Sequence, residues 1–216
     1  MNIIEAQDVD LIEPFPMSQA KRAYGWLHAY KNIVEHDLFP QNFEEFEAFL
    51  GALLPYAKSY GIIDKYNKLN IKHEAPIVGM IVLEPTSLWN CYIHIASTRR
   101  CWGSGFMDQG IRAVLDHVFE VYPNITRISA FVLSNNHPVK GLARRLGFKF
   151  EGILEDMVCQ RGEPKDIIHF GMTKRRWLGS VGEVSTSEEA LTPKKHDLSI
   201  DNTEVTPDTL LSNIDE

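Results

Sequence analysis

Hydrophobic residues recur with two different periods along most of the chain, and together the two periods predict a mixed α/β domain. Residues 18–30, 42–53 and 106–122 carry apolar side chains three and four positions apart, which is the spacing of one helix face. Ser18 and Asn42 stand at the starts of the first two helices, where they can act as N-caps. We therefore expect residues 1–57 to be mainly helical after a short opening strand near Ile3 and Ile4.

The remaining hydrophobic runs are continuous or alternating and predict strands at 59–64, 75–83, 89–96, 126–133, 148–158 and 167–173. Turn-forming residues separate the first three runs, so these should form an antiparallel meander. The strand 126–133 follows helix 106–122, and a strand that returns through a helix pairs in parallel with strand 89–96. The last two runs should close the sheet as a hairpin across residues 160–164.

A glycine-bearing turn joins strand 89–96 to helix 106–122 and has the sequence Arg100-Cys101-Trp102-Gly103-Ser104-Gly105. Its glycines let backbone N–H groups approach a ligand closely, and the first turn of the following helix adds unpaired N–H groups and the positive end of the helix dipole. Such a turn suits phosphate. It lacks the Gly-Lys-Ser/Thr ending of a P-loop and the third glycine of a dinucleotide fingerprint.

The pattern Arg-x-x-Gly-x-Gly resembles the pyrophosphate loop of the GNAT superfamily of N-acetyltransferases. A second stretch, residues 135–152, carries the resemblance further with an asparagine, a short helix, Leu-Gly-Phe at 146–148 and Glu-Gly at 151–152. These motifs are most similar to those of the ribosomal-protein-alanine acetyltransferase type. The resemblance implies a mostly antiparallel sheet with one parallel, splayed strand pair and helices on both faces.

The same resemblance implies that acetyl-CoA is the cosubstrate, with its pyrophosphate on the glycine loop and its pantetheine arm between the splayed strands. Arg144 and Arg145 would meet the CoA phosphates, although surface charge is the commoner fate of such a pair. The first two helices and the joining residues 36–39 would shape the acceptor pocket. The cofactor-binding residues implied in this way are Ile95, Ala96, Arg100, Cys101, Trp102, Gly103, Ser104, Gly105, Asn136, Arg144 and Arg145.

Acetyl transfer to an amine needs a group that takes the amine's proton, and Glu84 and His94 are the candidates on the central strands. The plainer alternatives are a hydrogen-bonded sheet histidine and a carboxylate that opens the turn at Pro85. A Cys101/His94 nucleophile is disfavoured because no third group orients the pair. Many acetyltransferases of this superfamily have a proton-donating tyrosine where this chain has Ala143, so the resemblance leaves retention of catalysis open.

The chain's net charge of −7 is concentrated at its C-terminal end, where residues 180–216 hold nine acidic residues and two lysines. The rest of the chain is neutral and gives no sign of a nucleic-acid-binding face. We expect a domain at 1–178 and an acidic, disordered tail at 179–216 that docks a protein partner or is simply solvated. Three cysteines without a Cys-x-x-Cys pair argue against a disulfide framework and against a structural zinc site.

No apolar run reaches the roughly 18 residues of a membrane helix, and the first ten residues do not resemble a signal peptide. We therefore expect a cytoplasmic protein without bound metal, as a monomer or a homodimer. The leading function is acetyl-CoA-dependent N-acetylation of a primary amine, either a protein N-terminus or a small molecule. The alternative is a catalytically silent protein that keeps the fold and binds a partner.

Overall fold

The computed structural model describes residues 2–29, 36–37, 40–66 and 77–183. Within these ranges the strands are β1 (Asn2–Glu5), β2 (Val9–Glu13), β3 (Lys58–Asp64), β4 (Ile77–Pro85), β5 (Asn90–Ser97), β6 (Arg127–Leu133), β7 (Lys149–Gln160) and β8 (Glu163–Thr173). The α-helices are α1 (Ala20–His28), α3 (Phe43–Leu53), α4 (Phe106–Val121), α5 (His137–Arg145) and α6 (Lys174–Glu183), with 3₁₀ turns η1 (Met17–Gln19) and η2 (Arg99–Cys101).

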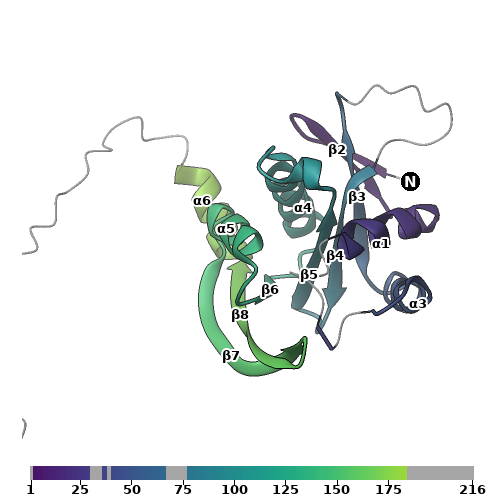
Figure 1. Ribbon diagram of the computed structural model, residues 1–216. Helices are drawn as coiled ribbons and strands as arrows, with labels where there is room; N and C mark the ends of the chain where they lie inside the picture. The colour runs from purple at the N-terminus through teal and green to yellow at the C-terminus, as the bar shows by residue number, and fades with distance from the viewer. Residues whose placement is uncertain (1, 30–35, 38–39, 67–76, 184–216) are drawn as a thin grey trace, which may run out of the picture.

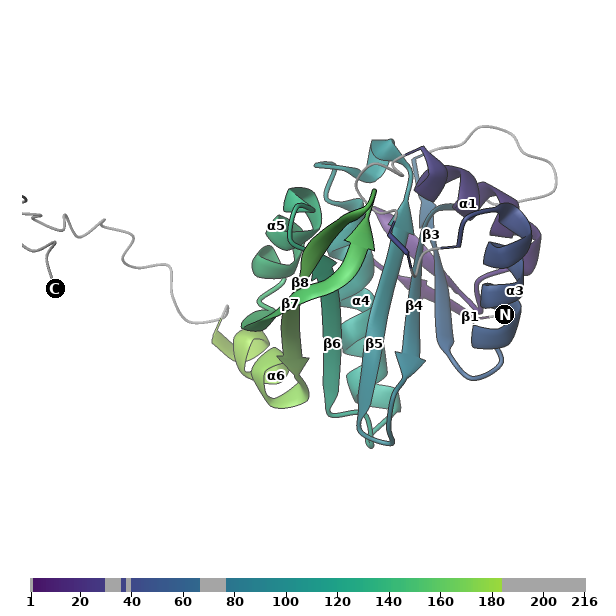
Figure 2. The same cartoon turned by 60° about the horizontal axis from the view of Figure 1, so that its bottom comes forward.

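The described strands form one sheet in the order β1-β2-β3-β4-β5-β6-β8-β7, which Figure 2 shows face-on from β8 through to β3. Each neighbouring pair is antiparallel except β5 and β6, which run parallel. The predicted meander, parallel crossover and closing hairpin are therefore confirmed. That hairpin turns at Arg161-Gly162, where both residues have positive φ (55° and 79°), as the twist of a two-residue hairpin turn requires.

Strands β5 and β6 pair only at their starting ends, from Asn90 opposite Arg127 to Tyr92 opposite Ser129. Beyond that point β6 continues to pair with β8 as far as Leu133, while β5 continues to pair with β4 as far as Ser97. The two parallel strands thus separate along the sheet and form a fork. The predicted splay is present.

Two of the three hydrophobic clusters in the described residues lie on opposite faces of the sheet. One contains the inward side of α4 with Leu142 of α5 and Trp177 of α6, and the other joins α1 and α3 to β4. Figure 1 shows α4 and α5 on one side of the central strands and α1 and α3 on the other. We call the α4 and α5 side the back face and the α1 and α3 side the front face.

The N-terminal region departs from the prediction. Residues 9–13 form a strand that was not predicted, within a region expected to be mainly helical, because Val9 and Leu11 are fully buried and alternate with partly exposed Asp10. Ser18 lies inside η1 and makes no cap, since α1 begins only at Ala20. The predicted cap at Asn42 is confirmed by a bond of 2.8 Å from the Glu45 N–H to its Oδ1.

At the other end of the domain, α6 runs from Lys174 to Glu183, so the expected division between residues 178 and 179 falls inside a helix. Trp177 anchors this helix: its side chain is buried and its Nε1 donates a hydrogen bond of 2.7 Å to Asp116 of α4. The expected tail beyond Glu183 lies outside the described residues. No helix of the described ranges is long and apolar enough to cross a membrane.

Candidate functional site

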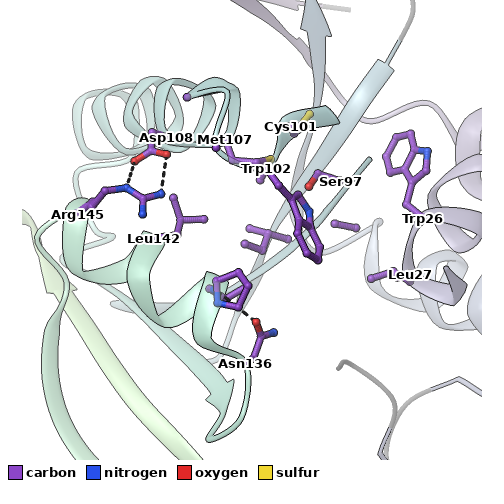
Figure 3. A pocket seen from close by; sticks show the side chains of 16 residues that line it. Trp26, Leu27, Ser97, Cys101, Trp102, Met107, Asp108, Asn136, Leu142 and Arg145 are labelled. Carbon is purple, nitrogen blue, oxygen red and sulfur yellow. Dashed lines mark hydrogen bonds and ion pairs between the residues drawn. The ribbon is translucent and has the colours of Figure 1, made fainter. Parts of the chain in front are cut away.

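A pocket of about 610 Å³ opens where β5 and β6 separate (Figure 3). Its walls come from the end of α1, the end of β5, the glycine turn, the start of α4, and α5. Eight of the predicted cofactor residues line it: Ile95, Ala96, Cys101, Trp102, Gly103, Gly105, Asn136 and Arg145. Arg100, Ser104 and Arg144 are not among the lining residues.

The glycine turn has the backbone geometry expected of an anion cradle. Gly103 and Gly105 adopt left-handed conformations (φ 71° and 84°), and Gly105 is the residue that precedes the 16-residue helix α4. Ser104 braces the turn, since its Oγ donates to the Cys101 carbonyl at 3.1 Å and accepts from the Phe106 N–H at 3.3 Å. The start of α4 lines the pocket at Gly105, Met107 and Asp108, so the first-turn N–H groups other than that of Phe106, and the positive end of the helix dipole, face the pocket mouth.

An arginine stands at the same mouth and is already paired. The Arg145 guanidinium donates two hydrogen bonds of 3.2 Å to the carboxylate of Asp108, in the first turn of α4 (Figure 3). Hydrogen bonding to Asp108 raises the pKa of Arg145, so this side chain stays cationic. Neighbouring Arg144 is exposed on α5.

Arg100 is directed away from the pocket and toward the end of β3. Its guanidinium lies 2.8 Å from the carboxylate of Asp64, whose side chain is fully buried. The contact is a close ion pair rather than an aligned hydrogen bond, because Asp64 Oδ2 has no hydrogen-bond partner in the described part of the chain. Arg100 therefore ties the glycine turn to the sheet.

Asn136 and Cys101 have local structural roles within the pocket wall. The Asn136 side chain caps α5 by accepting from the Val139 N–H at 3.3 Å. The Cys101 thiol donates to the Val78 carbonyl at 3.4 Å, and burial raises its pKa. Cys101 is therefore held as a protonated thiol, which is a poor nucleophile.

Two lining residues, Trp26 and Leu27, were not among the predicted cofactor residues, although their helix was expected to shape the acceptor pocket. They belong to the last turn of α1 and approach the pocket from the side opposite α5, as Figure 3 shows. The available signal was Trp26 itself, because a large aromatic residue lies outside the apolar positions that define the buried side of that helix.

The two candidate catalytic residues lie together, outside this pocket. Glu84 is at the end of β4, opposite Tyr92 in the register, and His94 is two residues further along β5. Their side chains meet diagonally, with His94 Nε2 at 2.7 Å from Glu84 Oε2. His94 also meets the ring of Phe49 from α3 at 6.5 Å, which places the pair on the front face.

His94 nevertheless adjoins the pocket through its neighbour in sequence. Ile95 lines the pocket and packs on the back-face core, and successive strand residues point to opposite faces of a sheet. His94 also lies just beyond Tyr92, the last β5 residue paired with β6. The imidazole is thus at the point of the fork.

No group of three or more metal-ligating side chains is found among the described residues.

A family model described as an acetyltransferase (GNAT) domain matches residues 11–149 of the chain. An uncharacterized N-acetyltransferase p20 of Bacillus licheniformis is 33% identical over 81 residues, which are 38% of this chain and 45% of that protein. The uncharacterized N-acetyltransferase YoaA of Bacillus subtilis is 31% identical over 75 residues, 35% of this chain and 42% of its own length. The chain thus spans less than half the length of these relatives.

Solved structures show the likeness of fold over a greater length. A ribosomal L7/L12 alpha-N-protein acetyltransferase (RimL) in complex with coenzyme A superposes with a TM-score of 0.65 at 17% identity, covering 80% of this chain and 98% of that one. The spermidine N-acetyltransferase of Vibrio cholerae, in complex with CoA and spermine, gives a TM-score of 0.63 at 16% identity, with coverage of 78% and 98%.

Proposed function

Because the chain belongs to the GNAT acetyltransferase family, we propose that it transfers the acetyl group of acetyl-CoA to a primary amine. The observation that carries the proposal is the coincidence of the glycine turn and the strand fork at one pocket. A helix N-terminus preceded by two left-handed glycines suits a diphosphate. The fork next to it leaves strand edges that β5 and β6 do not use on each other.

The described residues fit acetyl-CoA in three places. The N–H groups at Gly103 and Gly105 would hold the pyrophosphate, and Arg145 would add a cation at the same end. The edge of β5 at Ile95 and Ala96 would hydrogen-bond the extended pantetheine arm as an added strand does. The pocket volume of about 610 Å³ lies within the range typical of ligand sites.

Acetyl-CoA, when bound, supplies a thioester whose acyl carbon is open to attack by a neutral amine. An alkylammonium acceptor must first lose a proton, because its nitrogen lone pair is otherwise occupied. We assign this step to the pair of His94 and Glu84: the imidazole takes the proton, and the carboxylate 2.7 Å away orients the ring and stabilises its charged form. Ala143 is buried in the core and has no proton to give to the leaving thiolate.

No feature of the described residues favours the catalytically silent alternative. The division into a domain and a partner-binding tail remains a prediction from the sequence, since residues 184–216 are outside the described ranges.

The proposal is tested by titrating acetyl-CoA into the protein in a calorimeter and by following CoA release with a panel of amines. His94→Ala and Glu84→Gln should each lower kcat by about a hundredfold or more, the usual contribution of a general base, while the acetyl-CoA Kd stays unchanged. Full activity in His94→Ala would remove the pair from the mechanism. A parent protein that binds no acetyl-CoA would refute the function itself.

A further inference from the structure

A second hollow of about 380 Å³ lies on the front face between the end of α3 and the end of β4. It is lined by Phe49, Ala52, Leu53, Tyr56, Glu84 and Pro85. We infer that this hollow receives the acceptor, and that the acceptor is a primary amine with a single positive charge on an apolar body. The inference rests on the proposed function and specifies the substrate class.

The hollow adjoins the catalytic pair through two of its own lining residues. Glu84 lies 2.7 Å from His94, and the Phe49 ring meets the His94 ring edge-on at 6.5 Å. The next residue, Ile95, lines the cofactor pocket from the other face. The cofactor pocket also reaches the front face, where Trp26 and Leu27 of α1 line it. The acceptor and the acyl donor therefore meet beside His94 at the fork, where the amine nitrogen attacks the acyl carbon while the imidazole takes its proton.

The hollow's lining gives the acceptor an apolar body. Five of its six lining residues are hydrocarbon or aromatic in character, and two of these are large side chains left exposed: Phe49 is 43% and Tyr56 is 78% accessible. Apolar surface gathered in a concave site beside a reactive pair marks a binding surface rather than scattered exposure. The two aromatic rings also offer faces to a cation.

The charge count limits the acceptor to one ammonium group. Glu84 is the single charged side chain among the lining residues. Glu45, one turn before Phe49 on α3, is already occupied, because its two carboxylate oxygens accept from Gln41 N–H and Asn42 Nδ2, each at 2.8 Å. A second ammonium would thus find no other carboxylate among the residues that line the hollow, and an acidic group beside the amine would be repelled by Glu84.

The test compares CoA release from acetyl-CoA with 2-phenylethylamine, spermidine and a peptide that begins with aspartate. We expect kcat/KM for 2-phenylethylamine to exceed that for each of the other two by at least tenfold. Ala52→Trp fills the hollow from an exposed helix position and should raise the KM for 2-phenylethylamine at least tenfold, with the acetyl-CoA Kd and the Tm unchanged.

Ala48→Trp is the matched control, because Ala48 is exposed on the same helix but does not line the hollow. It should behave as the parent. Equal or better use of spermidine or of the acidic peptide, or an unchanged KM in Ala52→Trp, would overturn the assignment while leaving acetyl transfer standing. Failure to release CoA with any amine would remove the proposed function and this inference with it.

Discussion

Replacing Gly103 by valine has two expected effects, on phosphate binding and on backbone strain. The same substitution at Gly162 is a matched control that allows the two effects to be separated. Both glycines are left-handed, with φ of 71° and 79°, and at both positions an added Cβ meets no atom within 4 Å. Gly103 lines the pocket, whereas Gly162 lies in the β7–β8 hairpin turn. Valine should therefore strain both positions alike and obstruct only one.

The two contributions have distinct sizes. A left-handed conformation costs a residue with a Cβ about 1–2 kcal/mol, and each kcal/mol lowers the Tm of a domain of this size by roughly 2–4 °C. Both variants should lose stability by this amount. A charge-assisted hydrogen bond to phosphate contributes about 1.5–3 kcal/mol, so losing one N–H contact at Gly103 should weaken acetyl-CoA by roughly tenfold to 150-fold.

Calorimetric titration with acetyl-CoA and thermal unfolding of the free proteins measure the two contributions independently. The expected result is a similar Tm loss in Gly103→Val and Gly162→Val, with weakened binding in Gly103→Val alone. Parent-like affinity in a folded Gly103→Val protein would place the pyrophosphate elsewhere. Equal affinity losses in both variants would show that strain, not obstruction, controls binding.

Three further perturbations test other parts of the molecule. Asp108→Asn removes the carboxylate that holds Arg145, so CoA should bind severalfold more tightly in titrations at low salt; weaker binding would contradict the role of Arg145. Hydrogen bonding to Arg127 lowers the pKa of Glu151 from 4.5, so the pair stabilises the fold above that pH and ceases to do so as acid protonates the carboxylate. Denaturant unfolding should show Arg127→Gln about 1 kcal/mol less stable than the parent at pH 7, with a smaller gap well below pH 4, where the parent keeps only the hydrogen bond from Arg127 Nε to Ser129; a gap of unchanged size in acid would exclude the ion pair as its source. Trp177→Ala should cost about 3–5 kcal/mol in the same assay, whereas a loss below 1 kcal/mol would show that α6 is not part of the core.

Sequence alone predicted those parts of the fold in which elements consecutive in the chain pair with one another. The run from β5 through the glycine turn to α4 and β6 carries its own topology, because a strand that returns through a helix must pair in parallel. The strand β2 was missed because its five residues mix acidic and apolar types, and only burial against β3 and α4 distinguishes it from a surface helix turn. The local sequence pattern of β2 carries no information about β3 and α4, which are distant from it in the chain.

The lining of the pocket was predicted well at its glycine turn and less well at its side chains. Gly103 and Gly105 could be found because the backbone conformation itself selects glycine. The contact between Glu84 and His94 could not be deduced, because it depends on the exact register between β4 and β5, and a shift of one residue would turn one of them to the other face. Trp26 could not be placed in the pocket without the packing of α1.

Arg100 shows how one motif residue can hold the loop without lining the pocket. The carboxylate of Asp64 is fully buried, and a buried charge must be paired to be tolerated, so Arg100 is committed to it at 2.8 Å. A second link reaches the start of α4 itself, where the Gln109 side chain bonds the Asp8 N–H and carboxylate at 2.8 and 2.6 Å. Both links tie the glycine turn to the β1–β3 end of the sheet. The positive end of the pocket must therefore come from the α4 dipole and Arg145, with Arg100 holding the turn in the conformation that presents them.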